Sequence, residues 1–148
     1  MSVSVIHLLN DSQIDDLVVL YQKEWWSKGR TLNDVRTMLE NSDLVFGLVD
    51  DESGRLVGFA RVLTDMVYRA IIYDVIVAED LRGQDLGKRL MDAMMTDNVL
   101  ANVASVELHC LPAMESFYEK WGFAPNDSGT RPLRIRRGDA PIGDKASA

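Results

Sequence analysis

The residues most suited to binding a ligand lie in a glycine-containing segment from Leu81 to Leu90, read as LRGQDLGKRL. It follows the apolar run IIYDVIV and precedes the helical pattern MDAMM, so the layout predicts a strand, a turn and a helix. At such a junction, unpaired backbone N–H groups and the positive end of the helix dipole bind anions. The segment could therefore hold phosphate groups or be an ordinary connection, and its spacing alone does not decide.

The segment differs from the two common phosphate-binding motifs. A Walker loop needs Ser or Thr directly after Lys88, where this chain has Arg89, and the spacing is not G-x-G-x-x-G. Asp85, in the middle of the turn, would repel a phosphate. Because Asp accepts left-handed backbone angles and the next basic residues offset its charge, we expect anion binding that is weakened rather than abolished.

A second set of candidate residues lies in SFYEKWGF. Phe117, Tyr118 and Trp121 form an apolar helical stripe, in which a buried tyrosine most often has a structural role. Cys110 is the only cysteine and has no clear base partner, which makes it a weak nucleophile and excludes an internal disulfide. With one Cys and two His, no metal site is expected.

Composition limits the partners. The chain has 148 residues, 47% of them hydrophobic, which is typical of one domain with a real core. A formal charge of −7 disfavours general nucleic-acid binding. No apolar run reaches the roughly 18 residues of a membrane helix, and the N-terminus lacks a basic leader. We therefore expect a cytoplasmic protein with no nucleic-acid or membrane partner.

These candidate residues must be positioned by a mixed set of elements. Hydrophobic periodicity predicts the order β-α-α-β-β-β-α-β-α-β, an α+β fold in one domain over residues 1–137 with a flexible tail over 138–148. The predicted strands are VSVIHLL, LVFGLVD, LVGFARVL, residues 70–77, SVELHC and PLRIRR. The predicted helices begin at caps Ser12 and Thr31, at the glycine turn and at Pro112, with the first reaching Trp25 and Trp26 and the third about Leu100.

This order, together with VAEDLRGQDLGKRL and SFYEKWGF, resembles the GNAT superfamily of acyl-CoA-dependent N-acyltransferases. The resemblance covers about Val3 to Phe123, and both motifs have the family's order and separation. The family's first motif is [QR]-x-x-G-x-[GA]. Arg82 and Gly87 match it, whereas Asp85 replaces the first glycine. The resemblance implies a central, mostly antiparallel mixed sheet flanked by four helices.

The resemblance also implies a site for acetyl-CoA, the acyl donor of the family. Main-chain amides of the loop would hold its pyrophosphate, and the end of the preceding strand would pair with its pantetheine amides as an added strand would. The residues at these positions are Val75, Ile76, Val77, Arg82, Gly83, Gln84, Asp85, Leu86, Gly87 and Lys88.

Catalytic roles follow from the same resemblance. Tyr118 matches the tyrosine that many members use as general acid toward the coenzyme sulfur. The positions where members place a general base hold Ile71 and Tyr73; Ile71 cannot accept a proton, and Tyr73 is a poor base that could hold a water or the amine. Asp74 alternates to the other face unless the strand bulges, and a structural role is favoured for it. Glu107 and His109, on the neighbouring strand, could act through a water, and a structural role is favoured for both.

The acceptor is less defined than the donor. Trp25, Trp26 and Tyr68 lie in segments that wall the acceptor pocket in the family, and with an acidic chain they suggest a cationic or aromatic amine. Packing remains the commoner role for them. Four arginines alternate with Leu133 and Ile135, which is typical of a solvated edge strand rather than a nucleic-acid patch and offers a possible homodimer edge.

The resulting hypothesis is an N-acetyltransferase that acts on a primary amine of a small molecule or an exposed protein amine. Transfer would be by direct attack in a ternary complex, without a covalent enzyme intermediate. Two alternatives remain open: an acyl-CoA-binding sensor with little or no turnover, and an interaction domain without a cofactor.

Overall fold

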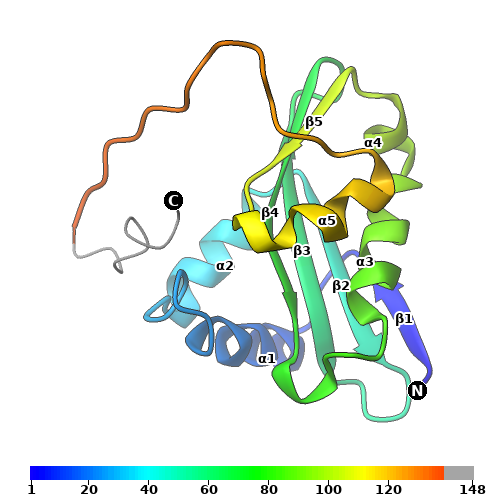
Figure 1. The fold of residues 1–148 in the computed structure, drawn as a ribbon. Helices are drawn as coiled ribbons and strands as arrows, with labels where there is room; N and C mark the ends of the chain where they lie inside the picture. The colour runs from blue at the N-terminus through cyan, green and yellow to red at the C-terminus, as the bar shows by residue number, and fades with distance from the viewer. Residues whose placement is uncertain (139–148) are drawn as a thin grey trace.

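The computed structural model describes residues 1–138 and contains one five-stranded sheet (Figure 1). Its strands are β1 (Val3–Ile6), β2 (Leu44–Asp50), β3 (Leu56–Thr64), β4 (Arg69–Val77) and β5 (Ser105–Leu108), in that spatial order. The first three pairings are antiparallel, and β4 and β5 are parallel. The predicted mixed, mostly antiparallel α+β fold is confirmed.

Helices cover both faces of this sheet (Figure 1). They are α1 (Asp11–Gln22), α2 (Leu32–Glu40), α3 (Leu86–Met95), α4 (Asn98–Asn102) and α5 (Glu115–Tyr118), with 3-10 turns at Glu79–Leu81, Pro112–Met114 and Glu119–Trp121. Tyr21 of α1 meets the ring of Phe59 on one face, with ring centroids 6.2 Å apart. Gly87 of α3 approaches Val77 on the other. We call these the α1 face and the α3 face.

Three helix boundaries differ from their predictions. The first helix is capped by Asn10, not Ser12, because the side chains and main-chain N–H groups of Asn10 and Gln13 bond reciprocally in a capping box. It ends at Gln22, before the Trp pair, whereas the Thr31 cap of α2 is as predicted. The helix expected to run to Leu100 stops at Met95 because Asp97 caps a new helix, α4.

The predicted last strand, PLRIRR at residues 132–137, is wrong: within the described residues this segment is neither helix nor strand and pairs with no strand. Alternating apolar residues favour a strand only where a neighbour can bury one face. Here Leu133 is 94% exposed and Ile135 is 76% exposed. The predicted tail over 138–148 lies, apart from Gly138, outside the described residues.

Candidate active site

The first part of the site is the unpaired edge of β4. Its register with β5 covers only Arg69–Ile72 against Ser105–Leu108. Within residues 1–138 no strand pairs with residues 73–77 on that side. Main-chain groups at the end of β4 are therefore open to an extended ligand that adds as a strand would. The structure places the predicted residues Val75, Ile76 and Val77 there.

A bulge sets the direction of this edge. Arg61 of β3 pairs with Tyr73 and Phe59 pairs with Ile76, so β4 carries one more residue than β3 between these pairs. The additional residue is Asp74, whose φ is 59°. Bulges bend a strand and re-aim its side chains. Here the bulge turns Asp74 to the α1 face, where plain alternation would not have placed it.

The second part is the loop between β4 and α3. Gly83 has φ 86° and Asp85 has φ 61°, so the left-handed conformation expected at Asp85 is confirmed. The first helical hydrogen bond runs from Arg89 N–H to the Asp85 carbonyl at 3.0 Å. In the described part of the chain, the six preceding amides, residues 83–88, donate no hydrogen bond to the protein. Free N–H groups at a helix N-terminus are the arrangement from which proteins build anion-binding sites.

Charged side chains near the loop are already engaged. Arg82 pairs with Glu24 of the α1 C-terminal turn at 2.7 Å, and Lys88 pairs with Asp92 at 2.8 Å. Asp92 and, to a smaller extent, Asp85 raise the pKa of Lys88. Because these cations have partners, the main-chain amides are the principal groups left for a phosphate. The Asp85 carboxylate is exposed and does not cap α3.

Substitutions at Asp85 can separate the effect of its charge from the effect of its left-handed backbone conformation. We expect Asp85→Asn and Asp85→Gly to bind acetyl-CoA about threefold to tenfold more tightly, because each removes a negative charge while tolerating the left-handed angle. Asp85→Ala removes the same charge but should lose about 1 kcal/mol of stability to backbone strain. Calorimetric titration and urea unfolding measure the two effects. Unchanged affinity in both Asn and Gly variants would show that the carboxylate does not face the anion.

The third part is Tyr118. Its segment is fixed on α3, because Trp121 Nε1 donates to Asp92 Oδ1 at 2.8 Å and a Cβ at Gly87 would lie 3.4 Å from the Phe117 ring. The Tyr118 ring packs edge-on against Phe117 and Phe123. Its hydroxyl makes no hydrogen bond with any residue in 1–138. Burial, and secondarily the Cys110 thiol, raise the pKa of Tyr118 to about 12. The hydroxyl is thus a protonated, uncommitted donor.

The α1 face carries a charge cluster, which we define as Tyr21, Arg30, Arg61 and Asp74; the side chains of Tyr21 and Asp74 are buried, whereas those of the two arginines are partly exposed. Asp74 Oδ2 accepts from the Tyr21 hydroxyl at 2.9 Å, from Arg30 at 2.8 Å and from Arg61 at 2.7 Å. Burial acts to raise the pKa of Asp74, but the two guanidiniums outweigh it and lower that pKa below its ordinary value. Asp74 therefore remains an anion with its partners fixed, which makes it a poor general base.

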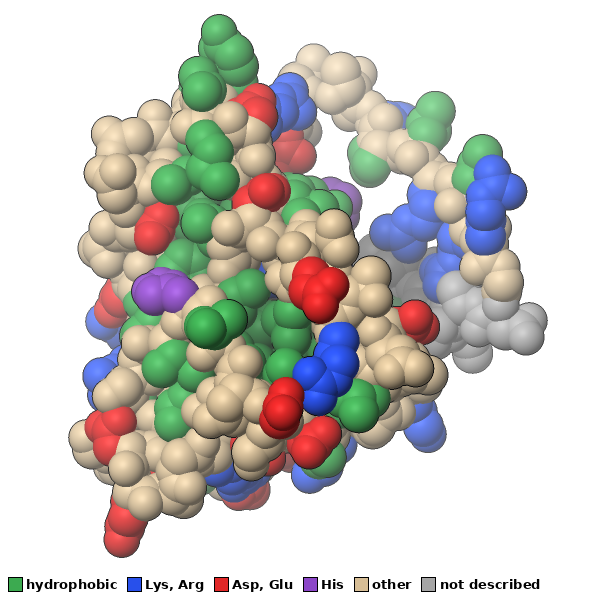
Figure 2. Space-filling view, turned by 180° about the vertical axis from the view of Figure 1, so that it is seen from behind, with side chains coloured by type: hydrophobic (Ala, Val, Ile, Leu, Met, Phe, Trp, Pro, Cys, Tyr) green, Lys and Arg blue, Asp and Glu red, His purple; other side chains and the backbone are tan. Residues whose placement is uncertain are grey.

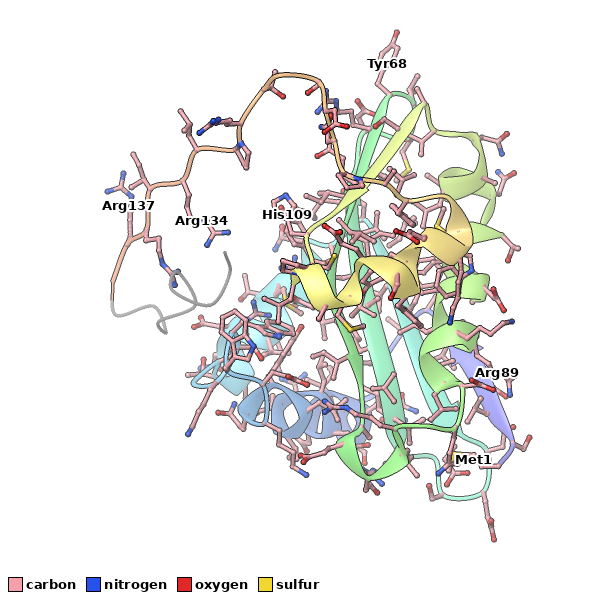
Figure 3. All side chains as sticks on the ribbon, viewed as in Figure 1. Met1, Tyr68, Arg89, His109, Arg134 and Arg137 are labelled. Atoms are coloured by element: carbon pink, nitrogen blue, oxygen red, sulfur yellow. The ribbon has the colours of Figure 1, made fainter. Side chains whose placement is uncertain are left out.

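The other base candidates lie on the α1 face or follow β5. The Tyr73 ring lies under the Arg61 guanidinium, 5.0 Å away. Glu107, opposite Ile71 in the sheet, pairs with Arg69 at 3.1 Å. His109 is exposed just after β5 (Figure 3). Of these candidates only Glu107 borders an open hollow of about 410 Å³, which is lined by Leu63, Thr64, Asp65, Arg69, Ala70, Ile71 and Glu107.

The three aromatic residues suggested for the acceptor pocket are not brought together. Tyr68 is 69% exposed at the tip of the β3–β4 hairpin, at the top of Figure 3, whereas the Trp pair follows α1 at the opposite end of β4 (Figure 1). Trp26 already packs edge-on against Tyr21 and lies 5.6 Å from the Arg30 guanidinium.

Comparison with known proteins agrees with this geometry. The model of the acetyltransferase (GNAT) domain matches residues 41–125, which hold β2 to α5 with both motifs. This chain belongs to the GNAT family. It is an acyltransferase of that family, and GNAT enzymes use acetyl-CoA as the acyl donor.

Three proteins similar to this GNAT enzyme each match at least three quarters of its chain. The uncharacterized N-acetyltransferase ycf52 of Porphyra purpurea is 33% identical over 130 residues, 85% of this chain and 74% of the relative. Serotonin N-acetyltransferase 2, chloroplastic, of Oryza sativa subsp. japonica is 32% identical over 116 residues, 76% of this chain and 58% of the relative. A solved structure assigned to the GNAT family, from Xanthomonas campestris pv. campestris, is 30% identical with a TM-score of 0.73, covering 89% and 94% of the two chains.

The described residues contain neither a metal-binding cluster nor a membrane-spanning helix. Within 1–138 no group of three or more His, Cys, Asp or Glu side chains could hold a metal ion. No helix in that range is both long and apolar enough to span a bilayer.

Proposed function

We propose that this GNAT enzyme transfers the acetyl group of acetyl-CoA to a primary amine by direct attack in a ternary complex. The observation that carries the proposal is the run of six free amides at residues 83–88, beside the unpaired edge of β4 and the α5 segment. These amides would hold the pyrophosphate, and the main chain of residues 75–77 would pair with the pantetheine arm.

The residues then have distinct roles in the transfer. A main-chain N–H at the end of β4, at Val77 or a neighbour, would polarise the thioester carbonyl. The neutral amine attacks the carbonyl carbon, the C–S bond breaks, and Tyr118 donates its proton to the departing sulfur. The amine loses a proton to water, and solvent reprotonates Tyr118. Tyr73 would position the amine or this water on the α1 face.

The raised pKa of Cys110, the only thiol in the sequence, also favours direct transfer. Burial and the Glu115 carboxylate raise the pKa of Cys110, so its reactive thiolate form is disfavoured. A covalent acetyl-enzyme on Cys110 would need the opposite shift. A Cys110→Ser variant should therefore retain turnover.

For the acceptor, we propose a small-molecule amine with an aromatic or apolar body. The support is the apolar side of the hollow at Leu63, Ala70 and Ile71, with the carboxylates of Asp65 and Glu107 at its margin. The rice relative is named for serotonin, an aromatic ethylamine. An exposed amine of a protein is the second acceptor class to be tested.

A sensor that binds acyl-CoA without turnover is the alternative function. It is favoured by one observation: Asp74 is fixed by two arginines, and Glu107 is paired with Arg69. The positions where family members place a base hold Ile71 and Tyr73, neither of which carries a carboxylate. An amine that loses its proton to water would not require a side-chain base, so acetyl transfer remains the favoured function.

A thiol-release assay separates the two functions. Serotonin, simple arylethylamines, polyamines and a lysine peptide are each incubated with acetyl-CoA, and the acetylated product is identified by mass spectrometry. We expect thiol release that depends on at least one amine and is largest for the arylethylamines. Acetyl-CoA binding by calorimetry without release for any amine would establish the sensor instead.

The pH dependence follows from the free amine and Tyr118. Since the pKa of Tyr118 is raised to about 12, the acid remains protonated and its contribution is lost only as pH rises through that value. We expect kcat/KM to rise with amine deprotonation and to show no falling limb from about pH 6 to about pH 10. A falling limb inside that range, in protein that remains folded, would remove Tyr118 from the role of acid.

A further inference from the structure

The Arg61 guanidinium is only partly used by the charge cluster on the α1 face. Its Nε donates to Asp74 Oδ2 at 2.7 Å, whereas its Nη1 and Nη2 groups donate to no acceptor within residues 1–138. No buried side-chain nitrogen in that range lacks a partner, so both Nη groups reach solvent. The two Nη groups at the end of a guanidinium can bind both oxygens of one carboxylate. We call this end of the side chain the Arg61 fork.

The charge beside the Arg61 fork is positive, although the chain as a whole is acidic. Arg30 and Arg61 share one carboxylate, because both donate to Asp74 Oδ2. Tyr21 remains neutral, since burial and the Asp74 anion raise its pKa. The cluster therefore has two positive groups and one negative group. In a partly buried site this excess favours an anionic ligand group and disfavours an additional cation.

Arg61 and Tyr73 lie next to the hollow on the same face of the sheet. They are opposite each other in the register of β3 and β4, with the Arg61 guanidinium 5.0 Å from the Tyr73 ring. Leu63 and Ile71, which line the hollow, are the next opposite pair on this face. Two residues of a strand span about 7 Å, so one small molecule can reach both pairs. Apolar side chains also reach the surface below the hairpin tip in the view of Figure 2.

These positions specify three groups of an acceptor. With the amine positioned at Tyr73, an apolar body lies over Leu63 and Ile71, and an anionic group lies at the Arg61 fork. An α-amino acid carries an amine, a carboxylate and a side chain on one carbon atom, which fits three sites that lie this close together. We infer that the acceptor is an α-amino acid with an apolar or aromatic side chain, whose carboxylate binds the Arg61 fork. This inference rests on the proposed function, because it assigns the amine to acetyl transfer.

Matched acceptors test the role of the carboxylate in the unaltered protein. Tryptophan, phenylalanine and leucine are each compared with the amine that lacks only the carboxylate and with the amino-acid amide, in which a neutral group replaces it. Rates of thiol release are referred to the concentration of neutral amine, because the compounds differ in amine pKa. We expect kcat/KM for at least one amino acid to exceed that of its amine and its amide by about tenfold to a hundredfold. If amines or amides react as well as the amino acids, the inference is wrong although acetyl transfer stands.

Binding of the reaction products tests the carboxylate site without turnover. The N-acetyl forms of the three amino acids and of their three amines are titrated by calorimetry into protein saturated with coenzyme A. We expect at least one N-acetyl amino acid to bind about tenfold or more tightly than its N-acetyl amine. Equal affinities, or no binding of any N-acetyl amino acid, would overturn the inference. If no acceptor released thiol, the proposed function would fail, and this titration would still decide whether the carboxylate site exists.

Arg61→Lys assigns the effect to the fork, because lysine keeps the positive charge but cannot bind both carboxylate oxygens in the same way. The ratio of kcat/KM for the amino acid to that for its amine should fall about tenfold. Arg36→Lys is the matched control: Arg36 is exposed on α2 and pairs with Asp11, so this variant should keep the wild-type ratio. Circular dichroism checks the fold, and the wild-type comparisons do not depend on either variant. A wild-type ratio in folded Arg61→Lys would contradict the assignment of the carboxylate to Arg61.

Discussion

Replacing Tyr118 by Phe is expected to lower kcat by roughly 10²–10³-fold while the KM for acetyl-CoA stays within about twofold of wild type. The substitution removes only the hydroxyl, which makes no hydrogen bond within residues 1–138, and leaves the ring packed against Phe117 and Phe123. The coenzyme sulfur would then have to leave without a proton donor. Steady-state rates of thiol release at saturating amine measure the effect.

Two other tyrosines serve as controls for this result. Tyr68→Phe, at the exposed hairpin tip, should leave both constants unchanged. Tyr73→Phe, on the α1 face beneath Arg61, should raise the KM of the acceptor more than it lowers kcat. If Tyr118→Phe turned over as fast as Tyr68→Phe, the general acid would have to be another group.

The largest expected effect on stability is at Asp74. Asp74→Asn should lower the free energy of unfolding by about 3 kcal/mol, because it removes the buried anion shared by the partly exposed Arg30 and Arg61 guanidiniums. Asn tolerates the left-handed angle at this position, so the loss reports charge rather than backbone strain. Urea unfolding at neutral pH, with an unchanged m-value, measures it.

Asp85→Asn is the matched control, since it is the same substitution at nearly the same backbone angle, φ 61° against φ 59°. Asp85 is exposed and has no ion pair in the described chain, so the change should be below about 0.5 kcal/mol. Equal effects at the two positions would show that the charge cluster does not stabilise the fold.

The same ion pairs predict an acid dependence. The pKa of Asp74 is lowered in the folded protein, so its stabilising contribution is present above the ordinary carboxyl pKa of 3.8 and is lost as pH falls through the folded value. The difference in stability between wild type and Asp74→Asn should therefore narrow below about pH 4.

The conformation of the loop between β4 and α3 was predictable because its signals are local. The glycine turn at a strand-to-helix junction and the permissive backbone of Asp85 are read from a few consecutive residues, and the loop conformation agreed. Main-chain amides need no particular side chain, so the unusual Asp did not alter the layout.

The charge cluster on the α1 face was not predictable because its residues are distant in the chain. Arg30, Arg61 and Tyr21 come from a loop, a strand and a helix, and only the bulge at Asp74 makes their meeting possible. The available signal was an isolated Asp inside the apolar run IIYDVIV. A mid-strand carboxylate that will be buried needs cationic partners, but the sequence does not say which.

The last strand shows a different limit. Alternation at PLRIRR predicted a strand that the described residues do not form, because pairing also needs a neighbouring edge that buries one face of the segment. The presence of such an edge is set by tertiary geometry, which alternation does not report.

The coenzyme site can be tested most directly at its amides. In a two-dimensional ¹H–¹⁵N NMR titration with acetyl-CoA, the N–H signals of residues 83–88 are expected to shift together and to gain protection from hydrogen exchange. The N–H groups of Leu32 and Asn33, at the start of α2, serve as the reference because they also begin a helix, and they should not shift. Saturable binding that left the signals of residues 83–88 unchanged would contradict the proposed acetyl-CoA site.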